Sequence, residues 1–335
     1  MSSVSRVTPS APMRRLFLPL VAITVASVII ATVAVRRMAG PSPGAAAEPT
    51  VRFSIELPPG VQLNATSSQR LAISPDGTRI AFNGETAAGR RLFVRSLDQV
   101  DPAPISGVEG AIGSLFFSPG GDWIAFNDTT SGSFRRVRVG GGPVATITDA
   151  RAASDGFRGA SWGEAGTIAF ATAATTALMQ VGDAGGSPQP LTRPGNGELH
   201  GQPHFLPGGK ALLFTATRPG VSDRIIAFSR EEQSQRDLLD GTTPRYATSG
   251  HLVFLRDQSL WAAPFDAASL QLTGDAVPLI DEVGVSGSLG VPGFGANALY
   301  DIDRTGTLVY TRKGDGRIVV VLHWFDELRR RAAAR

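Results

Sequence analysis

Two of the four histidines have a spacing that is typical of metal ligands. His200 and His204 are four residues apart, which on a helix would present both imidazoles to one zinc ion. Gly201, Pro203 and the following Pro207-Gly208-Gly209 preclude a helix there. On a strand the two side chains share a face but lie about 13 Å apart along the chain, too far for one metal ion. We therefore predict no metal site and expect both histidines to pack in a loop or at a sheet edge.

Motifs for a nucleophile or a nucleotide are absent or incomplete. Residues 284–288 approach the Gly-x-Ser-x-Gly nucleophile elbow of hydrolases but fail at its last position, and no α/β segment surrounds them. Gly293-Phe294-Gly295 lies in no strand–helix unit that could hold a dinucleotide. Cysteine is absent, which excludes disulfides, thiolate metal sites and cysteine nucleophiles. We therefore predict no catalytic, cofactor-binding or metal-binding residues, and no enzyme activity.

Four acidic residues stand beside glycines in short turns, namely Asp76, Asp122, Glu164 and Asp303. A carboxylate in such a turn commonly accepts hydrogen bonds from the turn's own backbone amides. Calcium would need several oxygen ligands converging from spaced positions, which this pattern lacks. We interpret all four residues as turn caps.

The overall charge argues against a polyanion partner. The 335 residues carry a formal net charge of only +3, and arginine supplies nearly all of the positive charge, since the only lysines are Lys210 and Lys313. Arginines that alternate with apolar residues, as around Arg135-Arg136, are typical of solvated strand faces. We expect no nucleic-acid partner.

The turns belong to a repeat. Ser74-Pro75-Asp76-Gly77 is followed by Ile80-Ala81-Phe82, and Ser118-Pro119-Gly120-Gly121 by Ile124-Ala125-Phe126. Related units end at Phe170 and Phe214, so that consecutive closing aromatics are 44 residues apart, and looser copies end at Phe254 and Tyr310. A constant period of this size indicates one supersecondary unit stacked on copies of itself.

Each unit parses into four short strands, with the turn between the first two. A four-stranded antiparallel sheet has two faces to cover, so we predict an all-β fold, a β-propeller of six four-stranded antiparallel blades. The closing aromatics should pack between neighbouring blades. The step from Phe254 to Tyr310 stretches to 56 residues, which leaves room for a seventh blade. We interpret the Gly/Ser-rich extra length, residues 281–296, as a long loop.

The two ends of the repeat region predict how the ring closes. The last unit ends in a strongly β-forming run, residues 318–322, with no fourth strand after it, and an extra strand, residues 51–57, precedes the first unit. We expect residues 51–57 to supply the outer strand of the last blade, so that the propeller covers residues 51–323. Residues 324–335 are a basic tail that we expect to form an amphipathic helix over the edge or base of that blade.

A membrane segment precedes the propeller. Leu16 and Val35 bound an uncharged, mostly aliphatic run of 20 residues, long enough to cross a bilayer core as a helix. We predict a single-pass transmembrane helix there, after a short tail, residues 1–15. A cleaved signal peptide ending at Ala45-Ala46-Ala47 is the alternative. Residues 36–50 are rich in Pro, Ala and Gly and are typical of a flexible linker.

Flanking arginines predict the orientation of that helix. Arg6, Arg14 and Arg15 precede it, whereas Arg36 and Arg37 follow it. The positive-inside rule therefore favours a cytoplasmic N-terminus. We expect the chain in the cytoplasmic (inner) membrane, with the propeller outside the cytoplasm, in the periplasm.

The repeat resembles a known family. Ser74-Pro75-Asp76-Gly77 followed by Ile80-Ala81-Phe82 is similar to the WD40-like (PD40) repeat of TolB-type six-bladed β-propellers. The order of membrane segment, spacer, Phe53-Ser54-Ile55-Glu56-Leu57, repeats and the closing His323-Trp324-Phe325-Asp326-Glu327-Leu328 resembles the C-terminal, extracytoplasmic part of bacterial receptor serine/threonine kinases of the PknB type. The kinase motifs are absent from the sequence, so the resemblance carries no kinase activity over.

Architecture and resemblance together favour a membrane-anchored, non-catalytic binding module with a sensor-like role. We expect a protein or peptide partner, or another ligand, at one face of the propeller, bound by loops at the mouth of the central channel. The sequence does not identify the residues in those loops that would bind it. A TolB-like envelope scaffold or assembly factor, and an orphaned sensor half of a receptor kinase, stay open as alternatives.

Overall fold

The computed structural model of the protein describes residues 48–63, 69–110, 112–148, 157–172, 174–286 and 297–333. The fold below is that of the unit Pro49–Arg335. The predicted membrane segment, residues 16–35, lies outside the described residues. Among the residues that are described, no helix is long and apolar enough to cross a bilayer.

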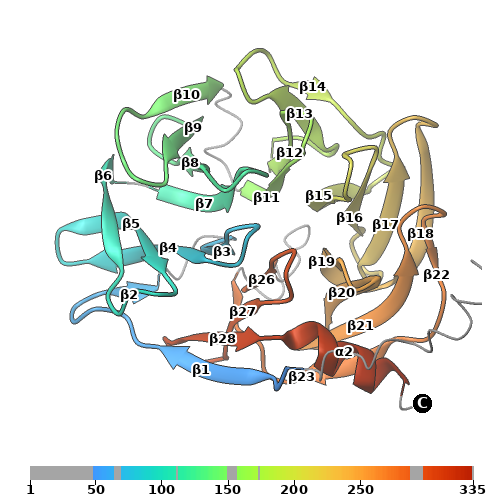
Figure 1. Cartoon of the computed structure of the whole chain (residues 1–335). Coiled ribbons are helices and arrows are strands. Elements are labelled where there is room, and N and C mark those ends of the chain that lie inside the picture. The colour runs from blue at the N-terminus through green and yellow to red at the C-terminus, as the bar shows by residue number, and fades with distance from the viewer. Residues whose placement is uncertain are drawn as a thin grey trace, which may run out of the picture. The chain divides into compact units, whose positions relative to one another are not determined.

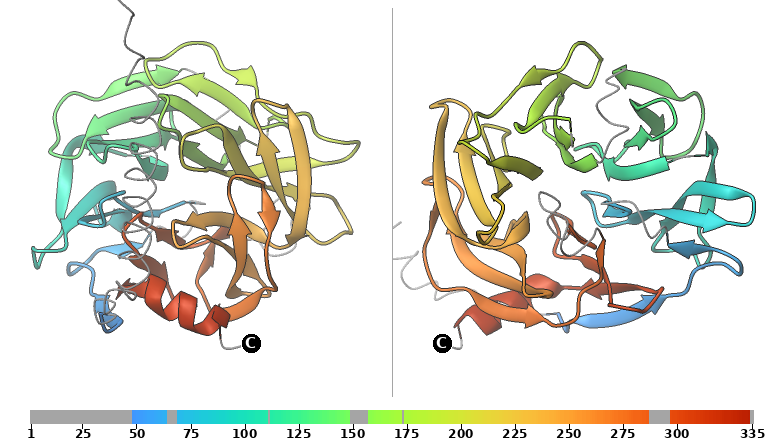
Figure 2. Two further views of the ribbon diagram at one scale, coloured as in Figure 1. Left: turned by 45° about the vertical axis from the view of Figure 1, so that its right-hand side comes forward. Right: turned by 180° about the vertical axis from the view of Figure 1, so that it is seen from behind.

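Six antiparallel sheets stand around a common axis as the blades of a closed ring (Figures 1 and 2). We number the blades I to VI in chain order and give their strands from the axis outward. Blade I has β3 (Leu71–Ile73), β4 (Arg79–Thr86), β5 (Gly89–Ser96) and β6 (Ala103–Glu109). Blade II has β7 (Ile112–Phe117), β8 (Trp123–Asp128), β9 (Ser133–Arg138) and β10 (Ala145–Thr148). Blade III has β11 (Phe157–Trp162), β12 (Thr167–Thr172), β13 (Met179–Gly182) and β14 (Gln189–Pro190).

The second half of the ring follows the same order. Blade IV has β15 (Leu199–Phe205), β16 (Ala211–Thr217), β17 (Arg224–Ser229) and β18 (Ser234–Asp240). Blade V has β19 (Thr242–Ala247), β20 (His251–Arg256), β21 (Ser259–Asp266) and β23 (Val277–Ile280). Blade VI has β26 (Tyr300–Ile302), β27 (Leu308–Thr311), β28 (Ile318–Leu322) and β1 (Val51–Ile55). Two short strands, β2 (Gln62–Leu63) and β22 (Gln271–Leu272), add to blades I and V.

The repeated motif forms the turn between the first two strands of each blade. In blade I the amide of Gly77 donates to the carbonyl oxygen of Ser74 at 2.8 Å. Gly77 has a φ of +72°, which glycine adopts without steric cost. The glycines at this place in the other turns also have positive φ: Gly121, Gly166, Gly209, Gly250 and Gly306. Because each turn follows an innermost strand, all of these turns lie at the same end of the propeller, which we call the turn face.

Two of the predicted turn caps are confirmed. Asp76 accepts hydrogen bonds from the amide and hydroxyl of Thr78 at 3.0 and 2.9 Å. Asp303 Oδ1 accepts from the amides of Thr305, Gly306 and Thr307 at 2.7, 2.6 and 2.8 Å. These carboxylates therefore satisfy backbone donors of their own turns.

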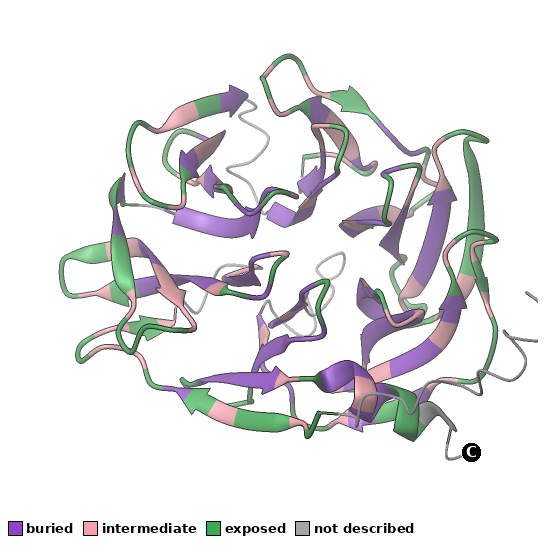
Figure 3. Ribbon diagram, viewed as in Figure 1, coloured by how far each residue is buried: buried purple, intermediate pink, exposed green. Residues whose placement is uncertain are grey.

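The closing aromatics are buried between neighbouring blades, as predicted. Phe126 of blade II packs with Ala72 and Leu92 of blade I. Across the seam of the ring, Phe82 of blade I packs with Val309 of blade VI. The remaining closing aromatics each pack in a cluster with residues of the preceding blade: Phe170, Phe214, Phe254 and Tyr310. Burial is accordingly highest on the inner and middle strands and lower on outer strands such as β18 (Figure 3).

The first strand closes the ring, which confirms the predicted seam. β1 pairs antiparallel with β28, with Val51 opposite Leu322 and Ile55 opposite Ile318. The strand is two residues shorter than expected and ends at Ile55, whose side chain is buried between blades VI and I. The first and last strands of the propeller therefore share one sheet.

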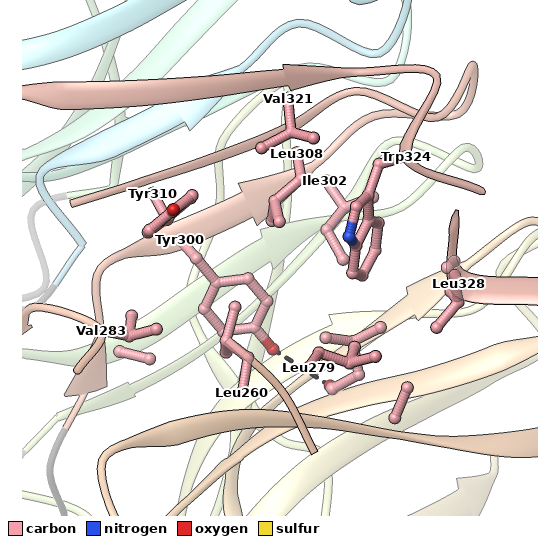
Figure 4. Close-up of a cluster of buried hydrophobic side chains, with 14 of the residues drawn as sticks. Leu260, Leu279, Val283, Tyr300, Ile302, Leu308, Tyr310, Val321, Trp324 and Leu328 are labelled. Carbon is pink, nitrogen blue, oxygen red and sulfur yellow. Dashed lines mark hydrogen bonds between the residues drawn. The ribbon is translucent and has the colours of Figure 1, made fainter. Parts of the chain in front are cut away.

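The predicted C-terminal helix is present as α2 (Trp324–Ala333). Its apolar residues pack in the cluster between blades V and VI (Figure 4): Trp324, Phe325 and Leu328. Arg331 donates to the carbonyl oxygen of Leu279 on β23 at 2.7 Å, and Glu327 pairs with Arg52 on β1. The helix therefore packs against blade V and also pairs with the closing strand of blade VI.

The segment after blade V is not a single loop, which corrects the interpretation of residues 281–296. β24 (Val285–Ser286) pairs with β25 (Asn297–Ala298), and Val283 bridges to Arg312. Residues 287–296 lie outside the described residues. The β24–β25 pair adds no blade, so the part of the chain that the structure describes forms six blades and not seven.

The turns of blades I and VI are close enough for a single methyl group to test their packing. A Cβ atom on Gly77 would lie 2.0 Å from Asp303 Oδ2, whereas a Cβ atom on Gly60, at a φ of +77°, would meet nothing within 4 Å. Both alanine variants have the cost of a left-handed backbone, roughly 1–2 kcal/mol. We expect Gly77→Ala to lose about 1–3 kcal/mol more than Gly60→Ala because of the added overlap. Urea unfolding of the two variants measures the difference, and equal losses would contradict the packing described.

Candidate functional site

A cavity opens on the axis of the propeller at the turn face. Its volume is about 250 Å³, and every blade contributes to its wall. At least one apolar residue from each blade lines it, among them Ile73, Phe116, Trp162, Phe205, Tyr246 and Ile302. These residues are the last or next to last of the innermost strands, because an inner strand running toward the turn face brings its last side chains to the mouth of the channel. A concave site whose wall combines apolar side chains with converging polar groups is typical of ligand-binding sites.

A buried ion pair lies in the wall of this cavity. Arg245 Nε donates to Asp301 Oδ1 at 3.2 Å, and Arg245 Nη1 donates to the carbonyl oxygen of Pro244 at 3.0 Å. Asp301 Oδ2 accepts from the amide of Ile73 at 3.1 Å. Burial raises the pKa of Asp301, and the charge of Arg245 opposes that rise. The pair joins blades V and VI, and the Ile73 amide extends it across the seam to blade I.

His204 lies beside this pair with part of its surface open to the cavity. Burial, together with the charge of Arg245, lowers the pKa of His204 to about 3. The imidazole is therefore neutral near pH 7, with one nitrogen as a donor and the other as an acceptor. It adds hydrogen-bonding capacity to the cavity but no charge.

A second ion pair crosses the mouth of the channel. Arg304 Nη2 donates to Glu164 Oε1 at 2.8 Å, and the two residues are on blades VI and III, on opposite sides of the ring. Glu164 Oε2 accepts a hydrogen bond from the amide of Gly208 at 3.0 Å. The amide of Arg304 donates to the carbonyl oxygen of Pro75 at 3.2 Å. Both side chains are about half exposed, at 51% and 43%. Glu164 is therefore a link between blades, and its interpretation as a cap of its own turn is wrong.

The two histidines singled out in the sequence are on the innermost strand β15, but they do not share a site. A bulge between Gly201 and His204 interrupts the regular alternation of that strand. His200 is fully buried, with Nδ1 at 2.8 Å from Thr192 Oγ1, Nε2 at 3.4 Å from Glu198 Oε1 and its ring against Phe214. Among the described residues, no three of His, Asp or Glu gather closely enough to hold a metal ion. His200 therefore packs between blades, whereas His204 faces the channel.

The described residues of the incomplete nucleophile elbow, residues 284–286, do not line the cavity. Ser286, the serine of the incomplete nucleophile elbow, is in β24. Gly287, Ser288 and Gly293-Phe294-Gly295 fall outside the described residues. Three charged residues of the cavity, Arg245, Asp301 and Arg304, were not anticipated, whereas Glu164 and Asp303 were singled out only as turn caps. The sequence did contain one signal for two of them. Arg245 directly precedes Tyr246, Asp301 directly follows Tyr300, and each is the only charged residue of its short innermost strand.

Burial of His200 makes the stability of the fold depend on pH. Burial lowers the pKa of His200 to about 4, although the charge of Glu198 opposes the shift. As the pH falls from about 6.5 to 4, the unfolded chain binds a proton that the folded chain does not, so the free energy of unfolding falls. His200→Asn, which keeps a polar atom near Thr192, should flatten this dependence. Between pH 7 and 8, the free energies of unfolding of the native protein and the variant should differ by a constant amount. Urea unfolding at each pH measures this free energy. If it fell equally for both proteins down to pH 4, His200 would not be the source of the pH dependence.

Comparison with known proteins supports the fold. The chain matches no family model and no curated protein by sequence. Among solved structures it is similar to TolB from Acinetobacter baumannii, at a TM-score of 0.50 and 13% identity, over 63% of this chain and 54% of that one. It is also similar to the putative TolB from Agrobacterium tumefaciens, at a TM-score of 0.52 and 17% identity, over 76% of this chain and 88% of that one.

Other propellers are equally similar. The WD40 domain of Toxoplasma gondii coronin gives a TM-score of 0.52 at 12% identity, over 81% of this chain and 85% of that one. Streptogramin B lyase gives a TM-score of 0.53 at 12% identity, over 81% of this chain and 97% of that one. Likeness at this level of identity concerns the fold and not the chemistry. By its fold, the chain is a six-bladed β-propeller of the TolB-like, WD40-like kind.

Proposed function

We propose that the chain is a non-catalytic binding module that contacts a protein or peptide partner through its turn face. The observation that carries this proposal is the cavity on the axis, to which all blades contribute and whose wall combines aromatic side chains with two ion pairs. Aromatic and arginine side chains are the residue types that most often dominate protein interfaces. A propeller fold in itself is compatible with many functions.

The surface around the cavity favours a macromolecular partner. Each turn exposes at least one residue at the rim: Asp76, Gly120, Glu164, Pro207, Thr248 and Arg304. Three of the turns contain a proline, Pro75, Pro119 and Pro207, so their backbones are restrained before a partner binds. Restraint of this kind lowers the entropic cost of binding. A cavity of about 250 Å³ holds one side chain or a small group, and the rim would contact the rest of the partner.

We further propose that residues 16–35 anchor the module in the cytoplasmic membrane, with the propeller in the periplasm. The support for this is the sequence of the segment and its arginine flanks. In that position the propeller would act either as a sensor-like module or as an envelope scaffold. An orphaned sensor half of a receptor kinase is a variant of the first role.

Photo-crosslinking separates the turn face from the opposite face. A photoreactive amino acid at Pro207 would lie on the turn face, and the same residue at Val221 would lie on the loop between β16 and β17, at the opposite end of the blade. Val221 is a suitable control because its side chain is also exposed, at 63%. We expect the full-length chain in cells to crosslink to a protein partner from Pro207 and not from Val221. Crosslinks from Val221 alone, or from neither position, would contradict the proposed binding face.

A further inference from the structure

The hydrogen-bonding groups of the cavity are unequally used. Each carboxylate oxygen of Asp301 and Glu164 accepts at least one hydrogen bond from the protein. Asp303 accepts four from its own turn. The carboxylates at this site are therefore already engaged, and a cationic ligand would have to displace protein donors from them.

The donors of the cavity, in contrast, have capacity left. The Arg245 side chain, only 7% exposed, uses Nε and Nη1 for Asp301 and the Pro244 carbonyl. Within the described part of the chain, its Nη2 donates no hydrogen bond, although Arg245 lines the cavity. At the mouth, Arg304 uses Nη2 for Glu164 and likewise has further guanidinium donors without acceptors among the described residues. A planar guanidinium with free N–H groups is well matched to a carboxylate.

The ion pair at the mouth can be exchanged at little cost. Glu164 and Arg304 are each about half exposed, and pairs with that exposure contribute at most about 1 kcal/mol. An incoming carboxylate could therefore take the place of Glu164 on Arg304. The charges of Asp301, Asp303 and Glu164 would repel a dianionic phosphate about twice as strongly as a carboxylate, which favours a singly charged ligand.

We propose that the cavity binds a carboxylate group carried on an apolar body, with Arg304 at the entrance and Arg245 and His204 in the wall. This inference rests on the proposed binding role of the turn face and names the chemistry that the face recognises. The apolar body would contact the aromatic wall formed by residues such as Trp162 and Phe205. Glu164 then acts as an internal competitor for Arg304.

The competition gives the proposal a signature that general loss of structure would not produce. The probe is N-acetyl-phenylalanine, and its control is N-acetyl-phenylalaninamide, which has the same shape without the charge. Binding to the full-length chain in lipid nanodiscs is measured by saturation-transfer NMR at low salt. We expect the carboxylate to bind about tenfold more tightly than the amide, because hydrogen bonds to charged groups are the stronger ones. Glu164→Gln should tighten carboxylate binding severalfold, and Arg304→Gln should weaken it severalfold.

Two further variants complete the test. Arg329→Gln removes an exposed arginine that is paired with Asp326 on α2, and it should leave binding unchanged. Arg245→Lys keeps the charge but loses the guanidinium fork, and it should weaken binding about tenfold. If Arg245→Lys does not fold, the opposite effects of the Glu164 and Arg304 variants still decide the matter. Equal binding of acid and amide, no binding of either, or no gain on Glu164→Gln would overturn the proposal. Crosslinking from Pro207 would still be expected in each of those cases, so the binding role is judged separately.

Discussion

The backbone pairing between β1 and β28, from Val51 opposite Leu322 to Ile55 opposite Ile318, joins the two ends of a ring that is otherwise built from consecutive segments. Each blade has apolar side chains on both faces and needs a neighbour on each side. Without β1, the outer edge of blade VI would present unpaired backbone groups. Ile55 would also leave the cluster in which Phe82 of blade I meets Val309 of blade VI. Closure therefore completes both a sheet and an interface between blades.

The candidate binding site depends on the same closure. Asp301 on blade VI accepts a hydrogen bond from the Ile73 amide on blade I, so this bond crosses the seam. Its partner Arg245 comes from blade V, and the pair of Glu164 with Arg304 joins blades on opposite sides of the axis. The buried charges of Arg245 and Asp301 would be costly unless they were paired, and these partners come from different blades. The charges of the channel are thus held in place by the ring and not by any one blade.

Much of the architecture followed from local signals. The Ser-Pro-Asp-Gly turn and the spacing of Phe82, Phe126, Phe170 and Phe214 predict the blades, because turn chemistry and hydrophobic period are properties of short segments. The unmatched run at residues 51–57 predicts closure by counting strands. The β24–β25 pair was missed because its strands have only two residues each, too few for a periodic signal.

The residues of the candidate binding site could not be predicted from such local signals. The sequence predicts a site at the channel mouth but names no residue, because Arg245 and Asp301 meet only when β19 and β26 lie side by side. The same limit explains Glu164. Its place beside Gly163 and Gly166 predicts a local cap, whereas its carboxylate reaches a residue 140 positions away. The different environments of His200 and His204 depend on the bulge between Gly201 and His204, which no sequence pattern predicts.

Because the chain has no cysteine, the closure can be tested by introducing one pair at a time. Phe53 lies opposite Val320 and Ser54 opposite Val319, so the Cα atoms of one of these pairs should have the close spacing that suits a disulfide. We predict that Phe53→Cys/Val320→Cys or Ser54→Cys/Val319→Cys forms a disulfide within one chain under mild oxidation, detected by mass spectrometry of the proteolysed monomer. A bond formed by neither pair, or only between two chains, would contradict the closed ring.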